Sequence, residues 1–173
     1  MCAQVRFARR YLVPRDGQIL NRDAAAAIPA SPWRDLTLVL LIVGLGMKAG
    51  LVPLHFWMPL AYGAAPIPAA AVMSGAAVKA SALALIRFLP FGVALPDFGL
   101  PLAAIGLFGA FYGVVIGIAQ SRPKIVLAYS SVSQMGFLVA VLGKGLAAGD
   151  AGAARVASFY AAHHLLVKGA LFL

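Results

Sequence analysis

The sequence contains no glutamate and few acidic residues of any kind. Five aspartates stand against 14 lysines and arginines, which gives a net charge of +9. Charged residues make up only 11% of the chain and hydrophobic residues 62%, whereas an average soluble domain is roughly 25% charged. A water-soluble core is therefore excluded, and the sequence predicts an integral membrane protein.

Cysteine is equally scarce, because Cys2 is the single cysteine in the chain. One thiol can form neither a disulfide framework nor a cysteine metal site within the chain. The sequence also lacks a glycine-rich phosphate-binding loop and a haem-attachment motif, so we expect no redox cofactor bound to it. His163 and His164 point about 100° apart on a helix, and no Cys, Asp or Glu is near them, so we expect no metal site.

The excess of positive charge does not indicate nucleic-acid binding. The basic residues are dispersed between apolar runs and form no stripe interleaved with aromatic residues. Lysine and arginine that flank membrane helices explain the same composition. Residues 1–34 are rich in arginine but lack an apolar stretch followed by a cleavage site, so we expect a basic connector outside the bilayer, with one short helix at the alanine run 24–27. Residues 35–173 are then the transmembrane domain.

Apolar runs divide the remaining sequence into about five spans, which predicts an all-α, polytopic transmembrane helix bundle. The run Leu36–Met47 would cover only about 18 Å as a helix, so to cross a core of roughly 30 Å it must continue through Lys48 to about Tyr62. Pro53 removes a backbone hydrogen bond and is expected to break this first span just after Lys48. The other spans are expected at 67–86, 98–119, 125–142 and 156–173, with a polar loop at 143–155.

Two lysines, Lys48 and Lys79, lie inside these apolar segments. Each would cost about 3 kcal/mol at the centre of a bilayer, and ionisable residues placed there mark functional sites by default. Lys48 could instead extend from a helix end to the membrane surface, whereas the central position of Lys79 makes that route long. We therefore expect both lysines to face the bundle interior or a wet cavity.

Other polar residues in the spans have both a structural and a functional interpretation. Ser74 and Ser81 belong to a set of small residues at helical spacing, which allow close helix packing. The fourth span carries a polar cluster that can hold neighbouring helices together or bind water, namely Ser130, Ser131, Ser133 and Gln134. His164 and Lys168 are four residues apart and therefore share one face of the last helix.

Three residues near the predicted break are interpreted mainly as structural. His55 is a structural or interfacial histidine in this interpretation, with a part in proton transfer as the alternative. Trp57 and Tyr62 are expected to anchor the chain at the membrane interface, as aromatic residues with a polar tip commonly do.

Three motifs resemble, in order, the signatures of a known family: KAGLVPLHFWMPLAYGAAPIPAAAVMSGAAVKASALALIRFLP, RPKIVLAYSSVSQMGF and HHLLVKGALFL. That family is the antiporter-like, proton-conducting membrane subunits of respiratory complex I (NADH:quinone oxidoreductase), membrane-bound hydrogenases and multisubunit cation/proton antiporters. The resemblance covers most of residues 34–173. It implies two inverted repeats with a broken helix in each, which is a general transporter device. Since the chain stops directly after an apolar run, it resembles a fragment of a longer protein.

The resemblance also implies roles for single residues. Its proton relay would here consist of Lys48, Lys79, His164 and Lys168, with Lys48 on the broken helix and Lys79 on the helix that follows. Tyr160 stands where the family has its first relay histidine, so His163 or a water would have to serve there. The family pairs its broken-helix lysine with a glutamate on an earlier helix, and this chain contains no glutamate.

Such a pairing has a physical reason. Taking an amine out of water disfavours its charged form, and a nearby carboxylate favours it again, so a moving carboxylate would switch Lys48 between holding and releasing a proton. We therefore expect proton translocation through a buried Lys/His relay, within a subunit of an NADH:quinone oxidoreductase or hydrogenase-type complex. The alternative is a non-transporting structural membrane subunit, or a truncated gene remnant without the glutamate helix.

The expected surroundings follow from the same interpretation. The partners would be the lipid bilayer, other membrane subunits, and protons or Na⁺, without nucleic acid and without a cofactor or redox centre in this chain. The location would be the bacterial inner membrane.

Overall fold

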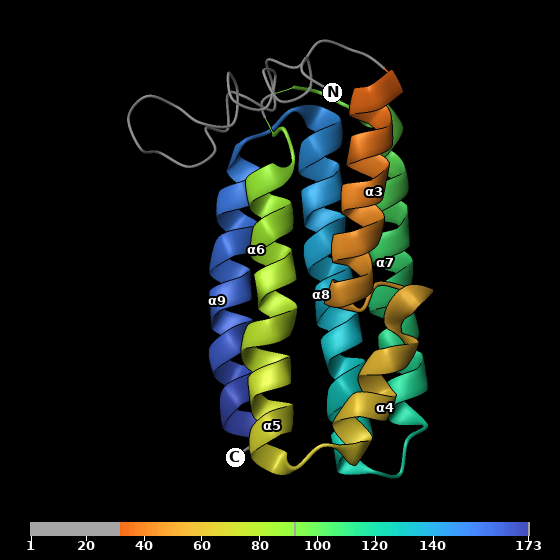
Figure 1. Ribbon diagram of the computed structural model, residues 1–173, viewed down its shortest axis with the longest axis vertical. Helices are drawn as coiled ribbons and strands as arrows, with labels where there is room; N and C mark the ends of the chain where they lie inside the picture. Colours follow the sequence, from red (N-terminus) through yellow and green to blue (C-terminus); the bar gives the residue numbers. More distant parts are fainter. Residues whose placement is uncertain (1–31, 92, 173) are drawn as a thin grey trace, which may run out of the picture.

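The computed structural model describes residues 32–91 and 93–172, and all regular structure within these ranges is helical. Most of the basic connector expected at residues 1–34, including its short helix at 24–27, lies outside the described residues. The helices form a bundle of parallel columns in which the chain runs alternately down and up (Figure 1). The prediction of an all-α helix bundle is confirmed.

Five columns make up the bundle. The first consists of α3 (Pro32–Ala49), the 3₁₀ turn η1 (Leu54–Phe56) and α4 (Trp57–Ala64). The second consists of α5 (Ile67–Val72), the π-helical turn η2 (Met73–Ala77) and α6 (Val78–Phe88). The others are α7 (Pro96–Ile118), α8 (Pro123–Ala148) and α9 (Gly152–Phe172). The first four columns are long and apolar enough to cross a membrane, so the chain is an integral membrane protein.

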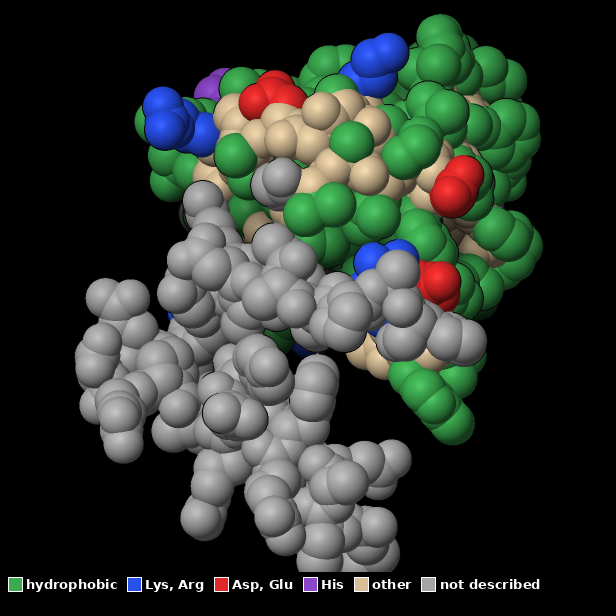
Figure 2. All heavy atoms as spheres, turned by 90° about the horizontal axis from the view of Figure 1, so that it is seen from above, with side chains coloured by type: hydrophobic (Ala, Val, Ile, Leu, Met, Phe, Trp, Pro, Cys, Tyr) green, Lys and Arg blue, Asp and Glu red, His purple; other side chains and the backbone are tan. Residues whose placement is uncertain are grey.

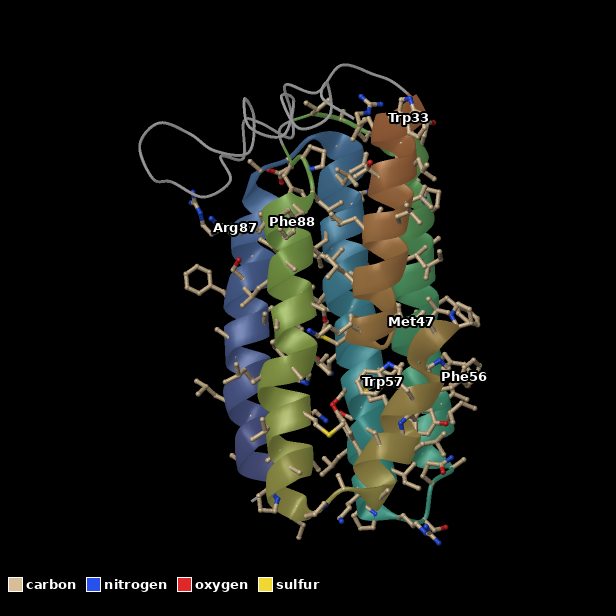
Figure 3. All side chains as sticks on the ribbon, viewed as in Figure 1. Trp33, Met47, Phe56, Trp57, Arg87 and Phe88 are labelled. Carbon is tan, nitrogen blue, oxygen red and sulfur yellow. The ribbon has the colours of Figure 1, made fainter. Side chains whose placement is uncertain are left out.

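The first column is broken where the sequence predicts it. α3 ends at Ala49, and the chain passes through Gly50, whose φ of 78° lies in the left-handed region that favours glycine. The indole Nε1 of Trp57 donates a hydrogen bond of 2.8 Å to the carbonyl of Met47, so the last turn of α3 is tied to the first turn of α4 (Figure 3). The break near Pro53 is thus confirmed. Trp57 bridges this break, and its place at a membrane interface stays a prediction.

The prediction of a polar loop at residues 143–155 is wrong. α8 continues to Ala148 and α9 begins at Gly152, so the connection is only residues 149–151. Gly143 lies inside α8, where the backbone of α7 passes directly against it. α8 ends instead at Gly149, whose φ of 68° gives the left-handed C-cap that is common at helix ends.

Glycines bring α7 and α8 into backbone contact along an antiparallel seam. Gly99, Gly106 and Gly113 recur at every seventh residue of α7 and are all buried. A Cβ added at Gly106 would lie 2.5 Å from the Ala140 nitrogen and 2.7 Å from the Gly136 carbonyl oxygen on α8. Small residues at such contacts allow helices in lipid to approach closely. The seam therefore fixes α8, which carries part of the site described below.

Acidic side chains of the described residues gather at one end of the bundle. Asp35 lies in the first turn of α3, Asp97 in the first turn of α7, and Asp150 between α8 and α9. These helix ends meet at the top of Figure 1, and the view onto that end shows acidic and basic side chains among apolar ones (Figure 2). Within the described ranges, the middle of the bundle consequently contains no carboxylate.

Candidate functional site

Two lysines and a histidine lie in the interior of the apolar bundle. Lys79 on α6 is 1% exposed, and Lys168 on α9 is 2% exposed. His164, one turn before Lys168, is 6% exposed. Hydrogen bonds through η2 and α8 connect Lys79 with Lys168, and His164 lies one turn before Lys168 on α9, so the structure brings these three predicted relay residues together.

The partner of Lys79 is a carbonyl that the π-helical turn makes available. Val78 donates its N–H to the carbonyl of Met73, five residues earlier, so the carbonyl of Ser74 loses the donor it would have in an α-helix. Nζ of Lys79 donates to this Ser74 carbonyl at 2.7 Å. Single π-helical turns are often found at functional sites.

Lys168 is held in a similar way from the opposite side. Its Nζ donates to the carbonyl of Leu127 on α8 at 2.9 Å. The hydroxyl of Ser131 donates to the same carbonyl at 3.1 Å, and this hydroxyl lies 3.2 Å from that of Ser74. The two amines are therefore connected through the protein by Ser74, Ser131 and Leu127.

His164 is placed beside an aromatic pair. Its Nε2 is buried without a hydrogen-bond partner among the described residues. Its ring stacks with that of Tyr160 at a centroid distance of 6.4 Å, and Tyr160 in turn packs against Phe137 at 5.4 Å. Tyr160, half-buried, thus contacts His164, whereas His163 is exposed on another face of α9.

Lys48, which is expected from the sequence to face the bundle interior or a wet cavity, is instead exposed at the last turn of α3 and is not part of the buried cluster. The face of α3 that packs into the bundle includes its neighbour Ala49, which is fully buried. Among the described residues, the predicted relay therefore consists of a buried group of three and an exposed lysine at the broken helix.

His55 and Tyr62, from the lower half of the first column, are both buried. The ring of His55 is 2% exposed and contacts Tyr112 of α7 edge-on at 5.0 Å, while Tyr129 of α8 lies at 6.2 Å. Tyr62 is 0% exposed, and its phenol interacts with the side chain of Ser74. The prediction that Tyr62 is an interface anchor is wrong, because α4 packs against α8 and brings the tyrosine into the core.

The polar cluster on α8 divides by face. Ser131 is fully buried and joins the two lysines, as described. Ser133 is buried on the seam with α7, where a Cβ on Gly113 would meet its nitrogen at 2.6 Å. Ser130 and Gln134 are half-buried on the flanks of α8. Of the four, only Ser131 bonds within the lysine cluster.

Sequence reasoning missed the part that Ser74 has in this site. Its small side chain indicates packing, and its spacing of five residues from Lys79 places the two about 140° apart on an α-helix. Only the π-helical turn aligns them. Within the described residues, no group of three or more His, Cys, Asp or Glu side chains could hold a metal ion.

The chain is similar to known membrane subunits over most of its length. The family model described as "NADH:quinone oxidoreductase/Mrp antiporter, TM" matches residues 18–173. NADH-quinone oxidoreductase subunit N of Desulforudis audaxviator is 38% identical over 170 residues, which cover 94% of this chain and 33% of that protein. An uncharacterized protein of Mycobacterium tuberculosis is 39% identical over 148 residues, which cover 84% of this chain and 23% of that protein.

A hydrogenase component is similar to the same extent. Hydrogenase-4 component B of Escherichia coli is 36% identical over 176 residues, which cover 94% of this chain and 26% of that protein. The chain thus spans about a third or less of the length of these relatives. The match to the family model over most of the sequence shows that this chain belongs to the NADH:quinone oxidoreductase/Mrp antiporter transmembrane family.

Proposed function

We propose that the chain belongs to a membrane subunit that moves protons through Lys79, His164 and Lys168. The observation that carries this proposal is the burial of two lysines, joined by hydrogen bonds, inside a bundle of membrane-spanning helices. Ionisable side chains at membrane depth are costly and usually mark an ion or proton pathway. Family membership supports the same assignment.

The cluster has the chemistry that stepwise proton transfer needs. A proton that leaves the Lys79 ammonium must reach a neutral base, and the Lys168 amine and the His164 imidazole are bases of the same cluster. Like charges disfavour each other, so a proton on one amine makes it harder to hold a second on the other. No carboxylate of the described residues lies among the two amines to stabilise two positive charges at once. Sharing one proton between the amines is therefore easier than protonating both.

Lys48 is proposed as a further member of the relay. It lies exposed at the helix break, apart from the buried cluster. We also propose that the subunit works in a redox-driven complex with other membrane subunits, in the bacterial inner membrane, and that protons or Na⁺ are transported. The relatives named as a subunit of NADH-quinone oxidoreductase and as a component of hydrogenase-4 support this assembly.

The proposal is tested by replacing each buried lysine with methionine, which keeps the length of the side chain and removes the proton carrier. The variants Lys79→Met and Lys168→Met are made in the full-length protein within its native assembly, in inverted membrane vesicles. Proton uptake is followed with a pH-sensitive dye while electron transfer is measured separately. Proton uptake should fall at least about tenfold, as expected for the loss of a positioned acid–base group.

Lys144 provides the matched control, because it is an exposed lysine on α8. Lys144→Met should transport like the unmodified protein. If Lys79→Met and Lys168→Met also transported normally in an intact assembly, the relay would be wrong and a structural, non-transporting subunit would be favoured. Lys48→Met in the same assay tests whether the exposed lysine takes part.

A further inference from the structure

We propose that Ser74 and Ser131 are positioning residues, which hold the Lys79 and Lys168 amines in a fixed relation to each other. This inference rests on the proposed proton transfer between those amines. Both serines are fully buried and come from different columns, η2 and α8, so their contact joins the helix that carries Lys79 to the helix that binds Lys168.

The hydroxyls of the serine pair lie in hydrogen-bond contact with each other and with the Leu127 carbonyl. A hydroxyl has a single hydrogen to donate, and the hydroxyl of Ser131 donates it to the Leu127 carbonyl at 3.1 Å. While it does so, Ser74 is the donor in the contact of 3.2 Å between the two hydroxyls, in which either hydroxyl can donate. Tyr62 of α4 is fully buried, and its phenol interacts with the Ser74 side chain.

Each amine is anchored to one end of this pair. The backbone carbonyl of Ser74 accepts from Lys79 at 2.7 Å, and the carbonyl of Leu127, shared with Ser131, accepts from Lys168 at 2.9 Å. Any movement of one serine relative to the other therefore changes the relation between the two amines.

Fixed acceptors matter because lysine side chains are long and flexible. An ammonium that rotates among several acceptors spends little time in a geometry from which its proton can pass on, and holding reacting groups in place removes that entropic cost. In this bundle the backbone supplies the two carbonyls, and the serine pair keeps those carbonyls in register across two helices. The serines act through the lysines and need not carry the proton themselves.

The plainer interpretation is that the serines only hold helices together. Ser81 shows what that role looks like, because it is 1% exposed and donates to the Val78 carbonyl of its own helix at 2.6 Å. Among the described residues, its hydroxyl makes no hydrogen bond to another column, so Ser81→Ala reports the effect of losing a buried hydroxyl alone.

The decisive comparison is Ser131→Val against Ser131→Thr in the full-length protein within its assembly. Valine and threonine have nearly the same shape, so both change the packing equally and only threonine keeps the hydroxyl. We expect Ser131→Val to lower proton uptake per electron about tenfold, the loss expected when a hydrogen bond near a charged group is removed. Ser131→Thr and Ser81→Ala should keep most of the activity.

A second measurement tests the geometry without relying on transport. In a Ser74→Cys, Ser131→Cys double variant, the two thiols should form a disulfide under mild oxidation, since the hydroxyl oxygens they replace are 3.2 Å apart. A Ser74→Cys, Ser81→Cys variant is the control and should not cross-link. Failure of the first pair to cross-link would overturn the inference.

The outcomes separate the two proposals. If the lysine variants lose transport but Ser131→Val does not, the relay stands and the positioning role is wrong. If Ser131→Val and Ser131→Thr lose transport equally, the serine matters only for packing, and the positioning role is again wrong. If the lysine variants transport normally, the relay and the positioning role fall together.

Discussion

The glycine seam between α7 and α8 makes a sharp prediction about two neighbouring glycines. Gly106→Ala should destabilise the bundle, whereas Gly109→Ala on the same helix should not. A Cβ on Gly106 would meet backbone atoms of α8 at 2.5 and 2.7 Å. At Gly109 the nearest atom would be a methyl group of Val52 at 3.5 Å, which is an ordinary contact.

The size of the effect follows from these distances. Relieving a contact of 2.5 Å to an ordinary 3.4 Å requires the two helix backbones to separate by about 1 Å, and backbone atoms cannot rotate away as a side chain can. Overpacking of this kind typically costs about 1–3 kcal/mol. Alanine also gains about 0.5–1 kcal/mol of helix propensity over glycine, but both variants share this gain. Their difference of about 1–3 kcal/mol therefore measures the seam alone.

The measurement is the free energy of unfolding of the full-length protein in mixed micelles, titrated with a denaturing detergent. Gly44→Ala serves as a second control, because no atom lies within 4 Å of a Cβ added there. We expect the Gly44 and Gly109 variants to match or exceed the unmodified protein in stability. If Gly106→Ala were as stable as Gly109→Ala, the close backbone contact between α7 and α8 would be refuted.

Two further predictions concern helix ends and use the same assay. Trp57→Phe removes the hydrogen bond to the Met47 carbonyl and should lower the free energy of unfolding by about 0.5–1.5 kcal/mol. Trp33→Phe is the control and should lower it less, because the side chain of Trp33 is 76% exposed. Equal losses in the two variants would mean that the indole of Trp57 does not bridge the break. Gly149→Ala forces a side chain into the left-handed region at φ 68° and should cost about 1–2 kcal/mol. Gly169→Ala, with open space around its Cβ, is the control, and a Gly149 variant of equal stability would contradict the C-cap.

Much of the fold could be predicted because it depends on local chemistry. The apolar runs predict the columns, and Pro53 predicts the break, since a proline removes a backbone hydrogen bond wherever it stands. The end of α8 could not be placed, because Gly143 has the same sequence signal whether it breaks a helix or packs one against its neighbour. Only the tertiary contact with α7 decides between the two.

Of the residues in the site, only the charged ones could be identified from the sequence. Lys79 and Lys168 are conspicuous in apolar sequence, so their burial has a signal that one sequence can show. Tyr62 has an amphipathic side chain that suits an interface and a core equally, and its burial depends on how α4 packs against α8. The role of Ser74 in the site depends on the π-helical turn, and no residue type in that segment predicts such a turn.

The π-helical turn determines which way the side chains of α6 point. A π-helical turn accommodates one residue more than an α-helical turn, so everything after Ala77 is rotated by about 100° relative to an uninterrupted helix. If the same residues formed an uninterrupted α-helix, the amine of Lys79 would be turned away from the interior by this angle, and the Ser74 carbonyl would regain its ordinary donor. The wide turn of the backbone, more than the identity of any side chain in it, thus decides which way the Lys79 side chain points.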